Sequence, residues 1–108
     1  MQILNFSRIA ENSKIVGNLE FVGESYIAGY ISGDLRVAAP GTLIIEPTGV
    51  VEGNINCDGI QILGTVLGNI YSTGHVIIKA SGRVKGQVES KSLQVMPGAQ
   101  LELEIDIQ

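Results

Sequence analysis

Apolar and polar residues alternate along most of this chain, and glycines interrupt the alternation. In the segment VEGNINC, Val51, Ile55 and Cys57 fall on one parity, whereas Glu52 and Asn56 fall on the other. A period of two is typical of a β-strand that buries one of its faces. No comparable helical period is found after residue 14, so the pattern predicts short strands and no helix there.

A glycine recurs in the middle of each strand-like segment. Gly53 stands on the inward parity, where a half-buried strand would normally carry a side chain. A sharp bend at this point leaves no room for a Cβ atom and can require a backbone conformation that other residues avoid. The sequence therefore predicts corners at Gly17, Gly33, Gly53, Gly68 and Gly86.

The chain also repeats itself. Residues 44–60 align without a gap on residues 77–93, and a related unit lies between them, so each unit has about 16 or 17 residues. Two further sets of bends give three bends per unit, and stacked units bury an apolar face that one unit cannot bury alone. We predict an all-β fold, a three-sided parallel β-helix of about six windings. The predicted windings are residues 25–42, 43–59, 60–75, 76–92 and 93–108, with one before them.

The first 14 residues depart from this repeat, and we predict a tail over residues 1–14 followed by a core over residues 15–108. The tail carries apolar residues and a cation, namely Met1, Ile3, Leu4, Phe6, Arg8 and Ile9. Two roles are open for it. It either contacts a membrane surface or covers the first winding as a cap.

The C-terminal segment QLELEIDIQ places Leu103 where the next corner glycine is expected. Apolar and acidic residues alternate in it, with no proline or lysine to blunt the end of the helix. Such an end presents unpaired backbone groups around an apolar cross-section. We predict that Leu101, Leu103, Ile105 and Ile107 meet the same residues of a second copy at a polymer interface.

Composition restricts the class of protein. The chain has 108 residues, enough for one domain, and its net charge of -4 argues against a nucleic-acid partner. One cysteine cannot form an internal disulfide, and no leader or run of about 20 apolar residues is present, so we expect a cytoplasmic protein.

Candidate chemistry is sparse. His75 is the single histidine, Cys57 has no CxxC partner, and no phosphate-binding loop motif occurs. We therefore predict no catalytic, cofactor or metal site, and no enzymatic activity. One enzymatic alternative stays open, because some apolar positions recur every six residues, as in β-helical hexapeptide-repeat acyltransferases. The residues Ile55 and Val88 break that six-residue rule.

The ordered run of glycine units from TLIIEPTG to LQVMPGA, residues 42–99, resembles the core of the bactofilins, and the resemblance covers about residues 24–100. It implies a right-handed three-sided β-helix that polymerises end to end without nucleotide into nonpolar filaments. It also implies partners: further copies of the chain, inner-membrane lipid, and the cell-wall or cell-shape proteins that such filaments scaffold.

Overall fold

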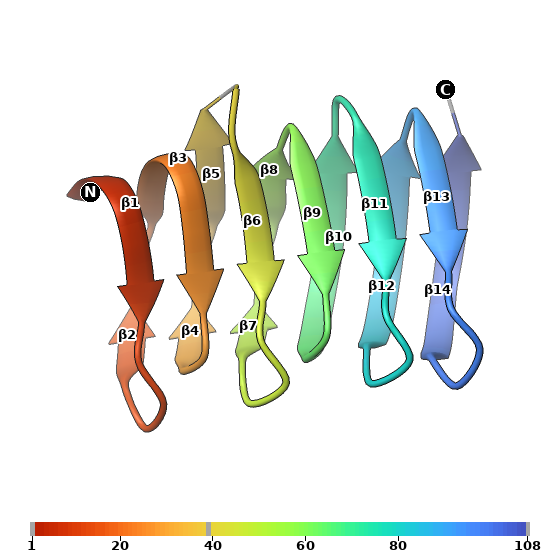
Figure 1. Ribbon diagram of the computed structural model, residues 1–108, viewed down its shortest axis with the longest axis horizontal. Coiled ribbons are helices and arrows are strands. Elements are labelled where there is room, and N and C mark those ends of the chain that lie inside the picture. Colours follow the sequence, from red (N-terminus) through yellow and green to blue (C-terminus); the bar gives the residue numbers. More distant parts are fainter. Residues whose placement is uncertain (1, 39, 108) are drawn as a thin grey trace.

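The computed structural model describes the backbone of residues 2–38 and 40–107, and the side chains of residues 8–38, 40–102 and 107. This described part contains no helix, and its strands join in one 14-stranded sheet (Figure 1). The strands are β1 (Gln2–Ile9), β2 (Lys14–Val16), β3 (Leu19–Ile27), β4 (Tyr30–Ser32), β5 (Leu35–Ala38), β6 (Thr42–Ile45), β7 (Val50–Glu52), β8 (Ile55–Cys57), β9 (Gly59–Ile62), β10 (Thr65–Ser72), β11 (His75–Ile78), β12 (Arg83–Ser90), β13 (Ser92–Val95) and β14 (Gln100–Ile107).

Parallel pairing arranges these strands in three columns, which form the three faces of a β-helix. Face A holds the ends of β1 and β3, then β6, β9, β11 and β13. Face B holds β2, β4, β7 and the starts of β10, β12 and β14. Face C holds the starts of β1 and β3, then β5, β8 and the ends of β10, β12 and β14.

The chain passes faces A, B and C in turn, six times. In Figure 1 it descends on the near face A and climbs on the far side while it advances from the N-terminus to the C-terminus, so the helix is right-handed. The predicted all-β, three-sided parallel β-helix is confirmed. Its windings reach face A at residues 25, 42, 59, 75 and 92, within one residue of the predicted starts.

The interior is filled by the side chains at alternate positions of the strands, on all three faces. Val51, Ile55 and Cys57 are buried, whereas Asn56 between two of them is exposed and Glu52 is half-buried. The alternation read from the sequence therefore gives the correct side for these residues. The largest fully buried side chain of the first winding is Phe21, opposite Leu4 of β1.

The corner between faces B and C is built on glycine. Gly17, Gly33, Gly53, Gly68 and Gly86 have φ angles from 130° to 148°, a region that L side chains rarely adopt. A Cβ atom at Gly53 would lie 2.1 Å from the carbonyl oxygen of Gly33 in the preceding winding. Beside this corner, Asn18 Oδ1 accepts a hydrogen bond from the N–H of Asp34, and Asp34 Oδ1 accepts one from the N–H of Asn54, each at 3.1 Å.

Both ends of the chain continue the pairing. In the segment predicted as a tail, β1 pairs with β3 from Gln2 to Ile9, with a shift of register between Asn5 and Ser7. At the other end, β14 pairs with β12 from Gln100 to Ile107 without a break, and Leu103 stands opposite the corner glycine Gly86. The backbone of the last winding therefore completes all three faces.

Candidate functional site

The C-terminal winding leaves the core of the helix open to solvent. In the winding before it, the inward residues Ile78 and Val84 are buried. Their equivalents in the last winding are Val95 and Leu101, whose exposed fractions are 41% and 38%. Ile107, on face C of the same winding, is 50% exposed. An apolar cross-section with one residue from each face therefore forms the C-terminal end of the described β-helix.

The backbone of this winding also has an open edge. The N–H of Gln100 donates to Gly82 O at 3.0 Å, and the N–H of Met96 donates to Ile78 O at 2.8 Å. Successive residues of a strand direct their backbone groups to opposite sides, so the groups of Leu101 and Val95 point away from the winding below. Within the described chain, β13 pairs with β11 alone and β14 with β12 alone. The end can therefore accept further strands.

The structure places the four predicted interface residues differently. Leu101 and Ile107 lie in inward columns and are exposed at the end. The backbone of Ile105 stands opposite Val88 in another inward column, whereas Leu103 occupies the corner position. The side chains of Leu103 and Ile105 lie outside the described residues. That these four residues form an interface stays a prediction.

Sequence reasoning missed two members of the same surface, Val95 and Leu93. They extend the face A columns of Ile78 and Val76, and Leu93 packs against the core while remaining partly exposed. The signal was present in the repeat, because LQV at residues 93–95 aligns with VII at residues 76–78. The prediction followed the alternation in QLELEIDIQ only and so left face A out.

The N-terminal end differs from the C-terminal end. Arg8 binds Glu46 through two hydrogen bonds, from Nε to Oε2 at 3.0 Å and from Nη2 to Oε1 at 3.3 Å. Ile9 is buried in the core. Of the other predicted contact residues, Met1 and the side chains of Ile3, Leu4 and Phe6 lie outside the described residues. Membrane contact and capping both stay predictions for this segment.

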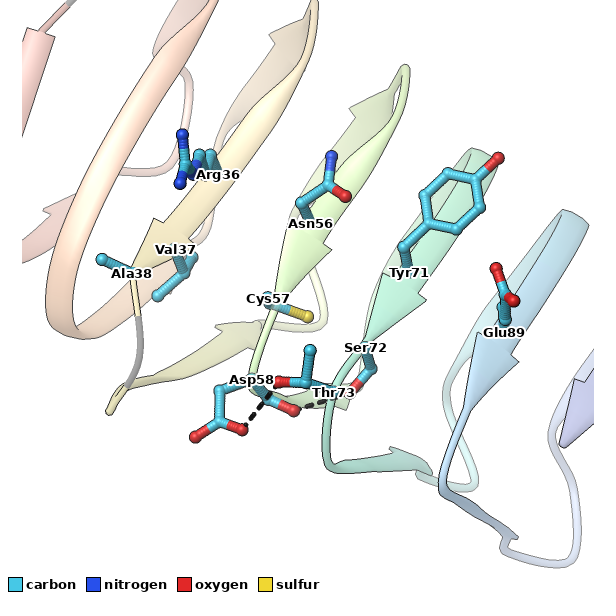
Figure 2. A pocket seen from close by; sticks show the side chains of 10 residues that line it. All are labelled: Arg36, Val37, Ala38, Asn56, Cys57, Asp58, Tyr71, Ser72, Thr73 and Glu89. Carbon is cyan, nitrogen blue, oxygen red and sulfur yellow. Dashed lines mark hydrogen bonds between the residues drawn. The ribbon is translucent and has the colours of Figure 1, made fainter. Parts of the chain in front are cut away.

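A groove of about 540 Å³ lies where face C turns into face A. Figure 2 shows Arg36, Asn56 and Tyr71 standing on successive strands along it. The turn at Asp58 also lines it: the carbonyl oxygen of Asp58 accepts a hydrogen bond from Ser72 Oγ at 2.6 Å, and its Oδ1 accepts one from Thr73 Oγ1 at 3.0 Å. These bonds fix the turn in place.

The two residues with the most reactive side chains are engaged in structure. Cys57 lines the groove but is buried, and this burial raises the pKa of its thiol to about 12. His75 is exposed, and its Nδ1 contacts the hydroxyl of Ser92 in the next winding. Across the described residues, no three His, Cys, Asp or Glu side chains group closely enough to hold a metal ion. In that same part of the chain there is no helix that could span a bilayer.

Comparison with known proteins gives one family and two relatives. The family model described as "Bactofilin: Polymer-forming cytoskeletal" matches residues 7–106. Bactofilin BacP of Myxococcus xanthus (strain DK1622) is 30% identical over 93 residues, which cover 86% of this chain and 38% of BacP. Bactofilin BacO of the same organism is 31% identical over 97 residues, which cover 80% of this chain and 77% of BacO. No solved structure matches the chain significantly.

Proposed function

The chain belongs to the bactofilin family of polymer-forming cytoskeletal proteins, and we propose that it stacks end to end into filaments that need no nucleotide and have no polarity. Its role in this proposal is structural, without catalysis. The filament lies in the cytoplasm, at the inner face of the cytoplasmic membrane, and serves as a scaffold for proteins that act on the cell wall or cell shape. A scaffold suits a filament because one surface is repeated many times along it.

The observation that carries this proposal is the exposed core of the last winding. Val95, Leu101 and Ile107 occupy columns that are buried in every interior winding, so a second copy stacked on them would cover them in the same way. Complete burial of such side chains contributes about 1.5 to 3 kcal/mol each, so covering the exposed part of each contributes about 1 kcal/mol. Together with the open strand edges, this favours association through the end of the helix.

Leu101→Lys tests the proposal, and Leu67→Lys is its matched control. The two leucines lie on face B with nearly equal exposed fractions, 38% and 37%, but Leu101 points inward in the last winding whereas Leu67 lies on the outer surface of an interior winding. We expect nucleotide-free wild-type protein and Leu67→Lys to form filaments in electron micrographs. Leu101→Lys places a charge in the joint, so we expect it to form no long filaments and to keep its β-type circular dichroism spectrum.

Long filaments of folded Leu101→Lys protein would remove the C-terminal end from the interface. A wild-type protein that assembles only after ATP or GTP is added would contradict the nucleotide-independent assembly.

A further inference from the structure

The two C-terminal ends can meet in only one way that keeps all three faces continuous. We propose that the joint has a two-fold axis through face B at Leu101, so that face A of each subunit continues into face C of the other. This arrangement rests on the proposed end-to-end assembly, and its partner is a second copy of this chain.

The first argument is the slope of the end. A β-helix advances along its axis by one strand spacing, about 4.8 Å, per winding. In the last winding face A therefore lies nearest the N-terminus, face B lies one third of a spacing further along the axis, and face C lies two thirds of a spacing further. A two-fold axis through face B stacks face A of each subunit on face C of the other and face B on face B. The distance between the stacked strands is then the same on all three faces. An axis through face A or face C leaves the gaps unequal by one strand spacing, with a missing or a clashing strand.

The second argument is the direction of the backbone groups. Leu101 points its N–H and C=O to the open end, so it can exchange two hydrogen bonds with Leu101 of the partner subunit as an antiparallel pair. On face A, the N–H groups of Ser92 and Met96 donate to the winding below. The backbone groups of Leu93 and Val95 therefore point to the open end, while their side chains belong to the inward columns. On face C, the equivalents of Ile105 in earlier windings, Leu19 and Leu35, donate to the winding above.

Matching these columns sets the pairing. Each of faces A and C offers two inward residues, so Val95 faces Ile105 of the partner subunit and Leu93 faces Ile107 of the partner subunit. The half-exposed side chains of Val95, Leu101 and Ile107 then all meet apolar columns. The helix continues through the joint with its core closed.

Charge supports the same axis. The outward residues between these pairs place Gln100 opposite Glu102 of the partner subunit, and Gln94 opposite Asp106 of the partner subunit. The Glu102 carboxylate thus faces an amide that can donate a hydrogen bond. An axis through face C would instead place Asp106 against Asp106 of the partner subunit, and like charges directly opposite are destabilising.

Variants with one added cysteine, cross-linked during assembly, distinguish the possible axes. Directly paired residues have Cα atoms about 5.5 Å apart, within reach of a short bifunctional thiol reagent. We expect Leu101→Cys to cross-link with itself. We expect Leu93→Cys and Ile107→Cys to remain at the wild-type background when each is alone and to cross-link when the two proteins are mixed. The wild-type protein is the background control, because its one thiol, Cys57, is buried.

Each other result overturns the proposal. Self-cross-linking of Asp106→Cys would put the axis through face C, and self-cross-linking of Gln94→Cys would put it through face A. Variants that assemble into filaments but never cross-link would show that the joint does not bring these residues together. Loss of filaments by wild-type protein under the same conditions would count against the end-to-end assembly itself, so the two failures are separable.

Discussion

At the scale of single residues, the B–C corner imposes two separate constraints on glycine. Gly53 has a φ of 146°, and it lies against the carbonyl oxygen of Gly33 in the winding below. Gly17 meets the first constraint alone, since its φ is 130° but a Cβ atom there would have no atom within 4 Å. The corner therefore demands glycine for its backbone conformation in the first winding, and for close packing as well in the interior windings.

Gly53→Ala should destabilise the fold by about 3 kcal/mol or more, because the added Cβ meets a backbone oxygen at 2.1 Å in a strained conformation. Gly59→Ala is the matched control. Its Cβ would meet no atom closer than 3.7 Å, so its free energy of unfolding should change by less than about 1 kcal/mol. Urea denaturation in the Leu101→Lys background, where we expect no assembly beyond dimers joined at their N-terminal ends, measures both. Equal effects of the two substitutions would contradict the role of the corner.

Cys57 should not react with thiol reagents in the folded protein at pH 8. Burial raises its pKa from 9.0 to about 12, so the reactive thiolate is roughly a thousandfold less populated than in the unfolded chain. Because the folded state holds the thiol proton more tightly than the unfolded chain does, the protonated thiol contributes to the free energy of unfolding. This contribution is fully present below pH 9 and is lost as the pH rises towards 12. Labelling kinetics with and without denaturant measure this, and equal rates would contradict the buried position.

Which glycines form corners could be predicted because each stands on an inward parity between aliphatic residues, as Gly53 does between Val51 and Ile55. A polar residue follows each corner glycine, in register from one winding to the next. At Asn18 and Asp34 the structure shows side-chain oxygens bonded to backbone N–H groups of the next winding. The repeat in the sequence places these side chains in one column. Which group donates the hydrogen bond to each side chain depends on the direction of the backbone N–H of the residue after the corner glycine, and the sequence does not give this direction.

At the scale of elements, β1 shows where sequence periodicity fails. Its pairing with β3 shifts between Asn5 and Ser7, so the inward parity changes within the strand. Leu4 stands opposite the buried Phe21 and Ile9 stands opposite the buried Ile27, so no single period of two runs through β1. The remaining signal was the equivalence of Ile9 to Ile27, 18 residues further on, which lies in the range of the repeat.

Arg8 should hold β1 against the windings that follow, because its two hydrogen bonds reach Glu46, two windings away on face A. Both side chains contact solvent, so the pair contributes at most about 1 kcal/mol. We expect Arg8→Ala to speed amide hydrogen exchange in β1 by about two- to fivefold and to leave β9 and β11 unchanged. Unchanged exchange in β1 would show that the ion pair does not anchor the strand.

The N-terminal segment should also give the polymer a weak affinity for membranes. A few apolar residues give marginal binding, which repetition along a filament multiplies. We expect wild-type filaments to sediment with lipid vesicles more completely than Leu101→Lys subunits do, and removal of residues 1–6 to abolish the difference. Full binding by the shortened protein would instead favour the capping role of the segment.

At the scale of the whole molecule, the architecture was predictable because one short unit recurs and each copy repeats its corners and inward columns. The 31 Å long axis agrees with six spacings of about 4.8 Å. The end surface was harder to predict. The residues near Leu101 are adjacent in the sequence, whereas Val95 joins them only when the winding closes, and no local pattern marks a residue as lying in the last copy of a repeat.

The most direct test of end-to-end stacking is a reconstruction of the wild-type filament by electron cryomicroscopy. We predict strands perpendicular to the filament axis, spaced about 4.8 Å apart through the joint between subunits, and a two-fold axis wherever two C-terminal windings meet. Windings that lie across the filament axis, or a C-terminal winding stacked on the N-terminal winding of the next subunit, would contradict this account.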